Sequence, residues 1–156
     1  YLRDRSVFGD DISIEDTMSV LVEYKSGAQM SYSLNSYCPW EGFVVTFTGS
    51  KGRIEYQQVE QSYINAGGDR NKEGALKSAT IRVCPMWGVP YEVDVGGHGG
   101  ADNVMLEDIF GANPPEDPFK RAAGYVDGAM SILTGVAANK SIASGMPVKI
   151  RDLVQF

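Results

Sequence analysis

The sequence predicts an α+β fold: an open, mostly antiparallel β-sheet with helices packed on one face. Residues 16–58 alternate between apolar and polar side chains, as strands with one buried face do, and short turns separate these runs. After residue 117, apolar residues instead recur every three or four positions, which is the period of an amphipathic helix. Strands first and long helices later favour helices gathered on one face of an antiparallel sheet.

The composition is that of one folded domain, which we place over residues 1–156. Of the 156 residues, 43% are hydrophobic and 22% are charged, which is ordinary for a globular protein. Fourteen basic and twenty acidic side chains leave a net charge of −6. Such a chain repels polyanions, so we expect no nucleic-acid partner. No apolar stretch approaches the ~20 residues that span a bilayer, and we expect no membrane partner.

Alternating residues define the predicted strands. A first hairpin, turning at residues 25–27, has its apolar positions at Met18, Val20, Val22, Met30, Tyr32 and Leu34. A third strand places Phe43, Val45 and Phe47 on one face, and a turn at residues 49–52 leads into a fourth strand. These four strands predict an antiparallel meander. Two further strands, near residues 81–83 and 91–95, would extend the sheet to six or more strands.

Two helices are expected in the last third of the chain. In the longer one, Asp117 is the expected N-cap, Pro118 the first helical residue, and Gly145 the residue just past the end. Its internal glycines, at positions 124, 128 and 135, each cost about 1 kcal/mol relative to alanine, which predicts a close neighbour there. A shorter helix is expected from Asp102 to Phe110.

One face of the predicted sheet is rich in hydroxyl and amide groups. It carries Ser31, Ser33, Asn35, Thr46, Thr48, Glu55 and Gln57. Such a face can simply meet solvent, or it can be a wet interface between identical subunits, because interfaces need not be more apolar than ordinary surface. The residues alone support the two interpretations equally.

The two cysteines do not indicate a metal or redox site. Cys38 and Cys84 lie far apart, and each precedes a proline, which is neither a zinc spacing nor a Cys-x-x-Cys pair. We expect buried free thiols and no metal.

His98 is the main candidate for chemistry. It is the only histidine, it lies between two pairs of glycines, and its unperturbed pKa is near neutrality. It can act as an acid, a base or a hydrogen-bond donor to substrate; the alternative, which the sequence favours, is a tight glycine turn in which His98 caps the next helix or meets water. Asp102 can orient His98 or a sugar hydroxyl. Alternatively it can cap the following helix or lie beside the positive end of that helix.

Aromatic residues in loops or at strand ends are a second group of candidates. They are Trp87, Trp40, Tyr37 and Tyr91. Their flat rings can stack on a sugar or anchor an interface, although packing in the core explains them equally well. Asp127, in the middle of the predicted long helix, is expected to be structural, either exposed or paired with Arg121 or Lys120.

Three stretches of the sequence resemble the C-terminal domain of the Gfo/Idh/MocA oxidoreductases, the family of glucose-fructose oxidoreductase and inositol dehydrogenase. They are residues 16–56, the GGHGGAD run at residues 96–102, and residues 127–153. Together they cover most of the chain. The first and third are fairly specific in combination, whereas the second marks only some branches of the family.

The resemblance implies a two-domain enzyme. An N-terminal Rossmann domain, absent from this chain, would bind NAD or NADP, while this domain would bind a sugar or cyclitol substrate and form a homo-oligomer through its sheet face. His98 and Asp102 match a loop near the substrate pocket, and Trp87 would form the pocket wall. The family's glycine-rich dinucleotide loop, Glu-Lys-Pro lysine and Asp-x-x-x-His pair have no counterpart here. We therefore expect a truncated piece that binds no cofactor, holds no catalytic residue and is inactive alone.

Two other readings stay open at this point. The resemblance also admits the family's NAD-dependent glycosidases, in which transient oxidation of the sugar enables elimination; that branch tends to carry the GHGG loop. From a different class, the chain would be a non-catalytic interaction domain that pairs through its sheet. We expect a cytoplasmic protein; an export signal upstream of Tyr1 would place it in the periplasm instead.

Overall fold

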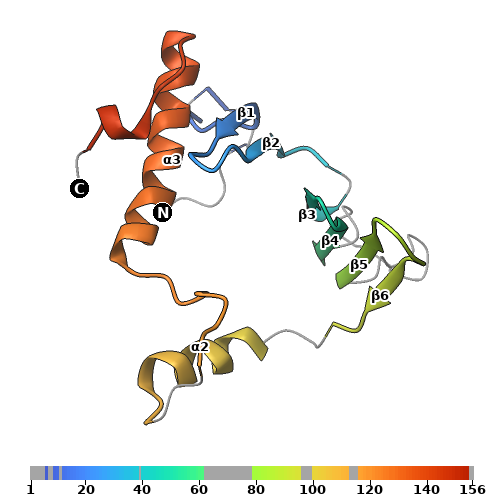
Figure 1. Ribbon diagram of the computed structural model, residues 1–156. Coiled ribbons are helices and arrows are strands. Elements are labelled where there is room, and N and C mark those ends of the chain that lie inside the picture. Colours follow the sequence, from blue (N-terminus) through green and yellow to red (C-terminus); the bar gives the residue numbers. More distant parts are fainter. Residues whose placement is uncertain are drawn as a thin grey trace. The chain divides into compact units, whose positions relative to one another are not determined.

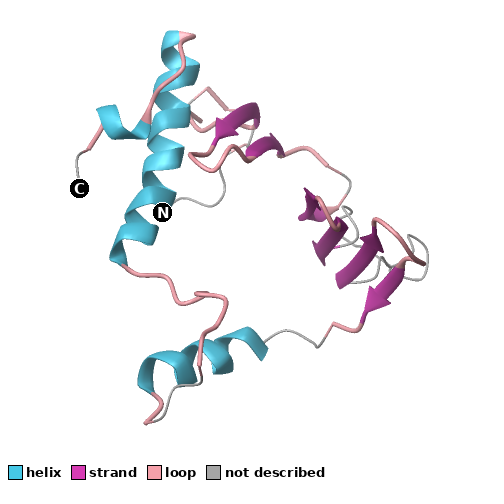
Figure 2. Cartoon of the chain, in the orientation of Figure 1, coloured by secondary structure: helices cyan, strands magenta, loops and turns pink. Residues whose placement is uncertain are grey.

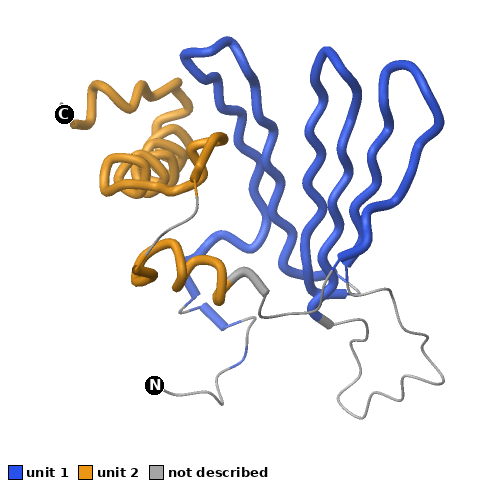
Figure 3. Tube along the Cα trace, turned by 60° about the horizontal axis from the view of Figure 1, so that its bottom comes forward, with its two compact units in different colours: residues 1–96 blue, residues 97–156 orange. Residues whose placement is uncertain are grey.

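The chain forms two compact units. A computed structural model describes residues 6, 9–10, 12–38, 40–61, 79–95, 100–112 and 116–154. Unit 1 covers residues 1–96 and contains the described strands, and unit 2 covers residues 97–156 and contains the described helices (Figure 3). Each unit is described by itself, so the packing of helices on the sheet stays a prediction.

The described residues of unit 1 form six antiparallel strands in two sheets (Figure 1). Their bounds are Thr17–Glu23 (β1), Gln29–Asn35 (β2), Glu41–Gly49 (β3), Gly52–Gln61 (β4), Ala79–Pro85 (β5) and Tyr91–Val93 (β6). β1 pairs with β2, and the other four follow one another in the order β3-β4-β5-β6. The α+β class with antiparallel strands and helices is thus confirmed (Figure 2).

The β1–β2 hairpin has the two faces that its alternation predicts. Met18 lies opposite Leu34, and Val20 lies opposite Tyr32, so the apolar side chains share one face. The turn closes with a 2.9 Å hydrogen bond from the Gly27 amide to the Tyr24 carbonyl oxygen, and Gly27 takes a positive φ of 84°. Glycine therefore suits this turn, and the turn fixes the register.

The second sheet likewise separates an apolar face from a polar one. On the apolar face, Val45 lies opposite Tyr56, and Tyr56 lies opposite Ile81. The rings of Phe43 and Tyr56 pack edge to face, with centroids 5.5 Å apart. The Tyr56 hydroxyl donates a 2.9 Å hydrogen bond to Oε1 of Gln58, which is 7% exposed, so this buried amide oxygen is satisfied.

The predicted meander is interrupted between β2 and β3. The Ser36 amide still donates a hydrogen bond to the carbonyl oxygen of Asp16, but the next amide, that of Tyr37, bonds 3.2 Å away to Oδ1 of Asn35. A side-chain acceptor two residues back turns the chain and competes with a strand ladder. β2 and β3 therefore do not pair, and the expected continuous sheet is two sheets.

Unit 2 contains helix α2 (Gly100–Phe110), helix α3 (Tyr125–Ser144) and the short 3-10 helix η1 (Ile150–Asp152). The predicted end of α3 is confirmed, because Gly145 is the C-cap in the left-handed conformation, with φ of 69°. Its predicted start is wrong: α3 begins at Tyr125, not near Pro118, and Gly124 is the N-cap.

The late start of α3 has a local cause. The carboxylate of Asp117 binds within its own loop, where Oδ2 accepts a 2.8 Å hydrogen bond from the Ala122 amide. Lys120 takes a positive φ of 50°, which a right-handed helix does not contain. Asp117 thus caps a loop instead of the helix. At the other two helical glycines, Gly128 and Gly135, an added Cβ would meet no described atom within 4 Å, so the predicted close neighbour is not found among the described residues.

Candidate functional site

Trp87 lies on the connection between β5 and β6, and its side chain is 91% exposed. Two features hold this connection. The Met86 amide donates a 2.8 Å hydrogen bond to the Lys51 carbonyl oxygen, in the turn between β3 and β4. Gly88 then takes a positive φ of 135°, which reverses the chain into β6. The sheet thus presents a free indole ring from an anchored loop.

The anchor depends on Gly52. Gly52 has φ of 147°, and a Cβ there would overlap the Cys84 carbonyl oxygen and lie 2.9 Å from the Cα of Pro85. Only a glycine allows β4 to start this close to the end of β5. The turn at residues 49–52 was predicted from its glycines, but its contact with the Trp87 connection was not.

Asp102 lies in the first turn of α2 and is exposed. The helix begins at Gly100, two residues before the expected start, so the N-cap interpretation of Asp102 is wrong. Its carboxylate lies in the first turn, beside the positive end of the helix, as the alternative interpretation predicted, and a negative charge is stabilised there. His98 lies outside the described residues. Trp87 belongs to unit 1 and Asp102 to unit 2, and each is placed only within its own unit.

The other predicted aromatic candidates differ in exposure. Tyr91 opens β6 on the apolar face, opposite Val83, and is 55% exposed. Tyr37 is 52% exposed, while Trp40 is half-buried, with a ring atom 2.8 Å from where a Gly42 Cβ would lie. Trp40 therefore has a packing role at the start of β3.

The remaining sequence candidates have structural roles. Asp127 is exposed, as one of its two structural alternatives predicted, but it lies in the first turn of α3 and not in the middle of the helix. Its Oδ2 accepts a 2.8 Å hydrogen bond from the Gly124 amide and so satisfies a donor at the start of α3. Cys38 and Cys84 are free, but Cys38 is exposed and Cys84 half-buried, so the predicted burial is wrong. Cys38 lies after the end of β2, just beyond the turn in which Asn35 accepts a hydrogen bond from the Tyr37 amide.

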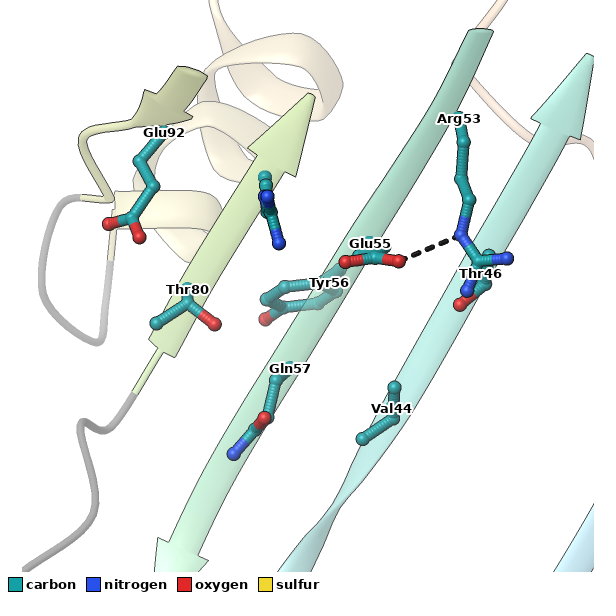
Figure 4. A pocket seen from close by; sticks show the side chains of 9 residues that line it. Val44, Thr46, Arg53, Glu55, Tyr56, Gln57, Thr80 and Glu92 are labelled. Atoms are coloured by element: carbon teal, nitrogen blue, oxygen red, sulfur yellow. Dashed lines mark ion pairs between the residues drawn. The ribbon is translucent and has the colours of Figure 1, made fainter. Parts of the chain in front are cut away.

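A row of polar side chains crosses the second sheet, one from each strand. Thr46 lies opposite Glu55, Glu55 opposite Arg82, and Arg82 opposite Glu92. We call these four residues the polar row, and the surface that bears them the polar face; Figure 4 labels Thr46, Glu55 and Glu92 of this row. They line a shallow depression of about 320 Å³ together with Arg53, whose Nε lies 2.8 Å from Oε1 of Glu55.

Sequence reasoning found only part of this face. Thr46, Glu55 and Gln57 were predicted to share it, whereas Arg53, Arg82 and Glu92 were missed. The alternation of Arg82 and Glu92 with Ile81, Val83 and Tyr91 is visible in the sequence. The register across strands, which places Arg82 between two glutamates, is not visible there.

Comparisons with known proteins cover nearly the whole chain. Residues 3–150 match the oxidoreductase family, C-terminal alpha/beta domain, of the Gfo/Idh/MocA proteins. The chain belongs to this family. The Gfo/Idh/MocA domain is also 35% identical over 161 residues to a protein of Bacillus subtilis (strain 168) described as "Putative oxidoreductase YteT". That alignment covers 100% of this chain and 36% of the relative, so the chain spans about a third of the relative's length. No solved structure matches this chain.

The described part of the Gfo/Idh/MocA domain offers a poor site for a dinucleotide. Phosphates bind at helix N-termini through free amides and the positive end of the dipole. Here both described α-helices carry a carboxylate in the first turn, Asp102 in α2 and Asp127 in α3, and these charges repel a phosphate. Asp127 also occupies the Gly124 amide.

Within the ranges that the structure describes, no group of three or more His, Cys, Asp or Glu side chains is placed to hold a metal ion. None of the described helices combines the length and the apolar character needed to cross a membrane.

Proposed function

We propose that this chain is the substrate-binding and oligomerisation domain of an NAD- or NADP-dependent oxidoreductase that acts on a sugar, a cyclitol or a derivative of one. Membership of the oxidoreductase family over residues 3–150 carries the proposal. The chain matches about a third of a longer relative, which leaves room for a cofactor domain elsewhere in the protein. The nicotinamide, bound by that domain, would be the hydride acceptor.

The role of this chain would be to bind and orient the substrate. A sugar presents hydroxyl groups at its edge and C–H groups on its ring face. The Asp102 carboxylate and the His98 imidazole are suited to hydroxyl groups, and the exposed indole of Trp87 is suited to the ring face. Neither the acid nor the base of the hydride transfer is assigned to this chain.

The test uses the full-length protein and a panel of sugars and cyclitols, with nicotinamide reduction as the readout. Trp87→Ala and Asp102→Asn should raise KM for the accepted substrate about tenfold and leave the Kd of the cofactor unchanged. Val89→Ala is the matched control for Trp87, because it lies two residues away and is 84% exposed. Asp108→Asn is the control for Asp102, because it is an exposed carboxylate on the same helix.

Two results would count against the proposal. One is a full-length protein that reduces neither NAD nor NADP with any member of the panel. The other is a pair of variants whose KM values equal those of their controls, which would remove Trp87 and Asp102 from the substrate site.

A further inference from the structure

We propose that unit 1 carries a second sugar-binding site, in the pocket between the segment that leads into β1 and the turn that follows β2, and that this site accepts sugars without a negative charge. The inference rests on the proposal that the protein binds sugars, and it adds a site separate from Trp87, Asp102 and His98. An aromatic ring, an apolar wall and a rim of acceptor oxygens carry it.

The pocket is built by two segments that a backbone hydrogen bond joins. β1 and β2 pair as far as Thr17 and Asn35. One residue further along, the Ser36 amide donates a 2.8 Å hydrogen bond to the Asp16 carbonyl oxygen, so the pairing continues into the wall of the pocket. The cavity of about 400 Å³ has a size that is usual for small-molecule sites. Its lining consists of Ile12, Ile14, Glu15, Asp16, Ser36 and Tyr37.

Tyr37 supplies the aromatic ring of the pocket. Its amide donates a 3.2 Å hydrogen bond to Oδ1 of Asn35, which turns the chain away from β2. Tyr37 is 52% exposed, so a ligand can reach it. Ile12 and Ile14 add aliphatic surface to the same lining. A flat ring with aliphatic neighbours suits the C–H face of a sugar ring.

The polar groups of the pocket suit the hydroxyl groups of a sugar and select against an anion. The carboxylates of Glu15 and Asp16 accept hydrogen bonds, and the Ser36 hydroxyl both donates and accepts them. Among the described residues that line the pocket, none is Lys, Arg or His. A carboxylate or phosphate on the sugar would therefore meet two negative charges without a counter-charge. A neutral sugar avoids this repulsion, and a protonated amino sugar is attracted.

The pocket and the Trp87 connection lie at opposite ends of β3. Tyr37 precedes the first residue of this strand, whereas the Trp87 connection is bonded to the turn after its last residue, through the Met86 amide and the Lys51 carbonyl oxygen. β3 has nine residues. At a rise of about 3.3 Å per residue, its two ends are roughly 26 Å apart. We therefore assign Tyr37 and Trp87 to different sugar rings.

The test measures sugar binding to the full-length protein by isothermal titration calorimetry. Methyl glucoside, glucosamine and glucuronate are the neutral, cationic and anionic probes. The titrations use the Trp87→Ala background, which weakens the first site and leaves the second. In this background Tyr37→Ala should raise the Kd of the neutral and cationic probes about tenfold, whereas Tyr37→Phe keeps the ring and should change the Kd less than about twofold.

Tyr125→Ala is the matched control for Tyr37, because Tyr125 is an exposed tyrosine on α3, outside the pocket. If Tyr37→Ala fails to fold, Tyr37→Leu keeps apolar bulk without a flat ring and should give the same loss. The double variant Glu15→Gln with Asp16→Asn tests the charge selection. It should strengthen glucuronate binding about tenfold relative to methyl glucoside, and Asp108→Asn, an exposed carboxylate on α2, should not.

Four results would overturn the inference. In the Trp87→Ala background, they are the absence of binding by any probe and a Kd that Tyr37→Ala leaves unchanged. In the wild type, they are glucuronate bound as tightly as methyl glucoside, and a Tyr37 ring that resists nitration by tetranitromethane without sugar, because another part of the protein then covers the pocket. The proposed function is tested separately, by reduction of NAD or NADP with the sugar panel, and survives each of these results.

Discussion

The Met86 amide lies 2.8 Å from the carbonyl oxygen of Lys51, and this hydrogen bond joins the connection that carries Trp87 to the turn between β3 and β4. Residues more than thirty positions apart thus share one corner of the sheet. The relationship matters because Trp87 is almost fully exposed and has little packing of its own to hold it. Its position is set by the backbone beneath it.

Gly52→Ala should weaken this corner. The added Cβ would overlap the Cys84 carbonyl oxygen, and the positive φ of 147° is unfavourable for alanine, so we expect a loss of about 1–3 kcal/mol in the free energy of unfolding, measured by urea titration. Gly49→Ala is the control, because its Cβ would meet no described atom within 4 Å. Equal stability of the two variants would show that the Gly52 contact is not a constraint.

Asp127→Ala should destabilise the start of α3. It removes the acceptor of the Gly124 amide and a negative charge near the positive end of the helix, which together are worth about 1 kcal/mol. Asp127→Asn keeps an acceptor oxygen and should recover part of the loss. Helix content at 222 nm during thermal unfolding is the readout, and an alanine variant as stable as the wild type would argue against the cap.

The stability contributed by Asp117 should depend on pH. The backbone amides of Arg121 and Ala122, aided by the Arg121 guanidinium, hold the pKa of this carboxyl below its ordinary value. The ionised form therefore stabilises the folded chain above the pKa of the unfolded chain, about 3.9, and this stabilisation is lost as pH falls through the lower folded value.

The measurement is the difference in Tm between the wild type and Asp117→Asn, taken from pH 7 down through the titration of the carboxyl. The difference should be constant near neutrality and shrink below pH ~4. Asp108→Asn, at an exposed position on α2, serves as the reference. A difference that grows as the solution becomes more acidic has the wrong sign for a lowered pKa.

His98→Ala should impair the use of substrate in the full-length protein. If the imidazole binds a substrate hydroxyl, its removal should raise KM or lower kcat about tenfold and leave the Kd of the cofactor unchanged. Lys140→Ala on α3 is a control outside the glycine-rich run. Steady-state kinetics and a separate cofactor titration give the two readouts, and unchanged kinetics would remove His98 from the site.

Sequence patterns located the elements well where the cause was local. The alternation of Phe43, Val45 and Phe47 placed β3, and Gly145 marked the end of α3, because each pattern depends on neighbours a few residues away. The start of α3 was missed although its cause is also local. Asp117 is a good N-cap residue, but its carboxylate accepts a hydrogen bond from the Ala122 amide and closes a loop of its own. The residue type is the same for both uses, so only the structure distinguishes them.

The sequence by itself determined the α+β class, the two-faced strands and the turns at Gly27 and Gly52, since these follow from composition and short-range periodicity. The family came instead from the resemblance of three stretches to known proteins. The tertiary structure decided that the strands form two sheets, that Trp87 rests on the Lys51 turn, and that Glu55, Arg82 and Glu92 stand in one row. Strand register brings residues that are far apart along the chain to positions about 4.8 Å apart in space, and no local pattern encodes that pairing.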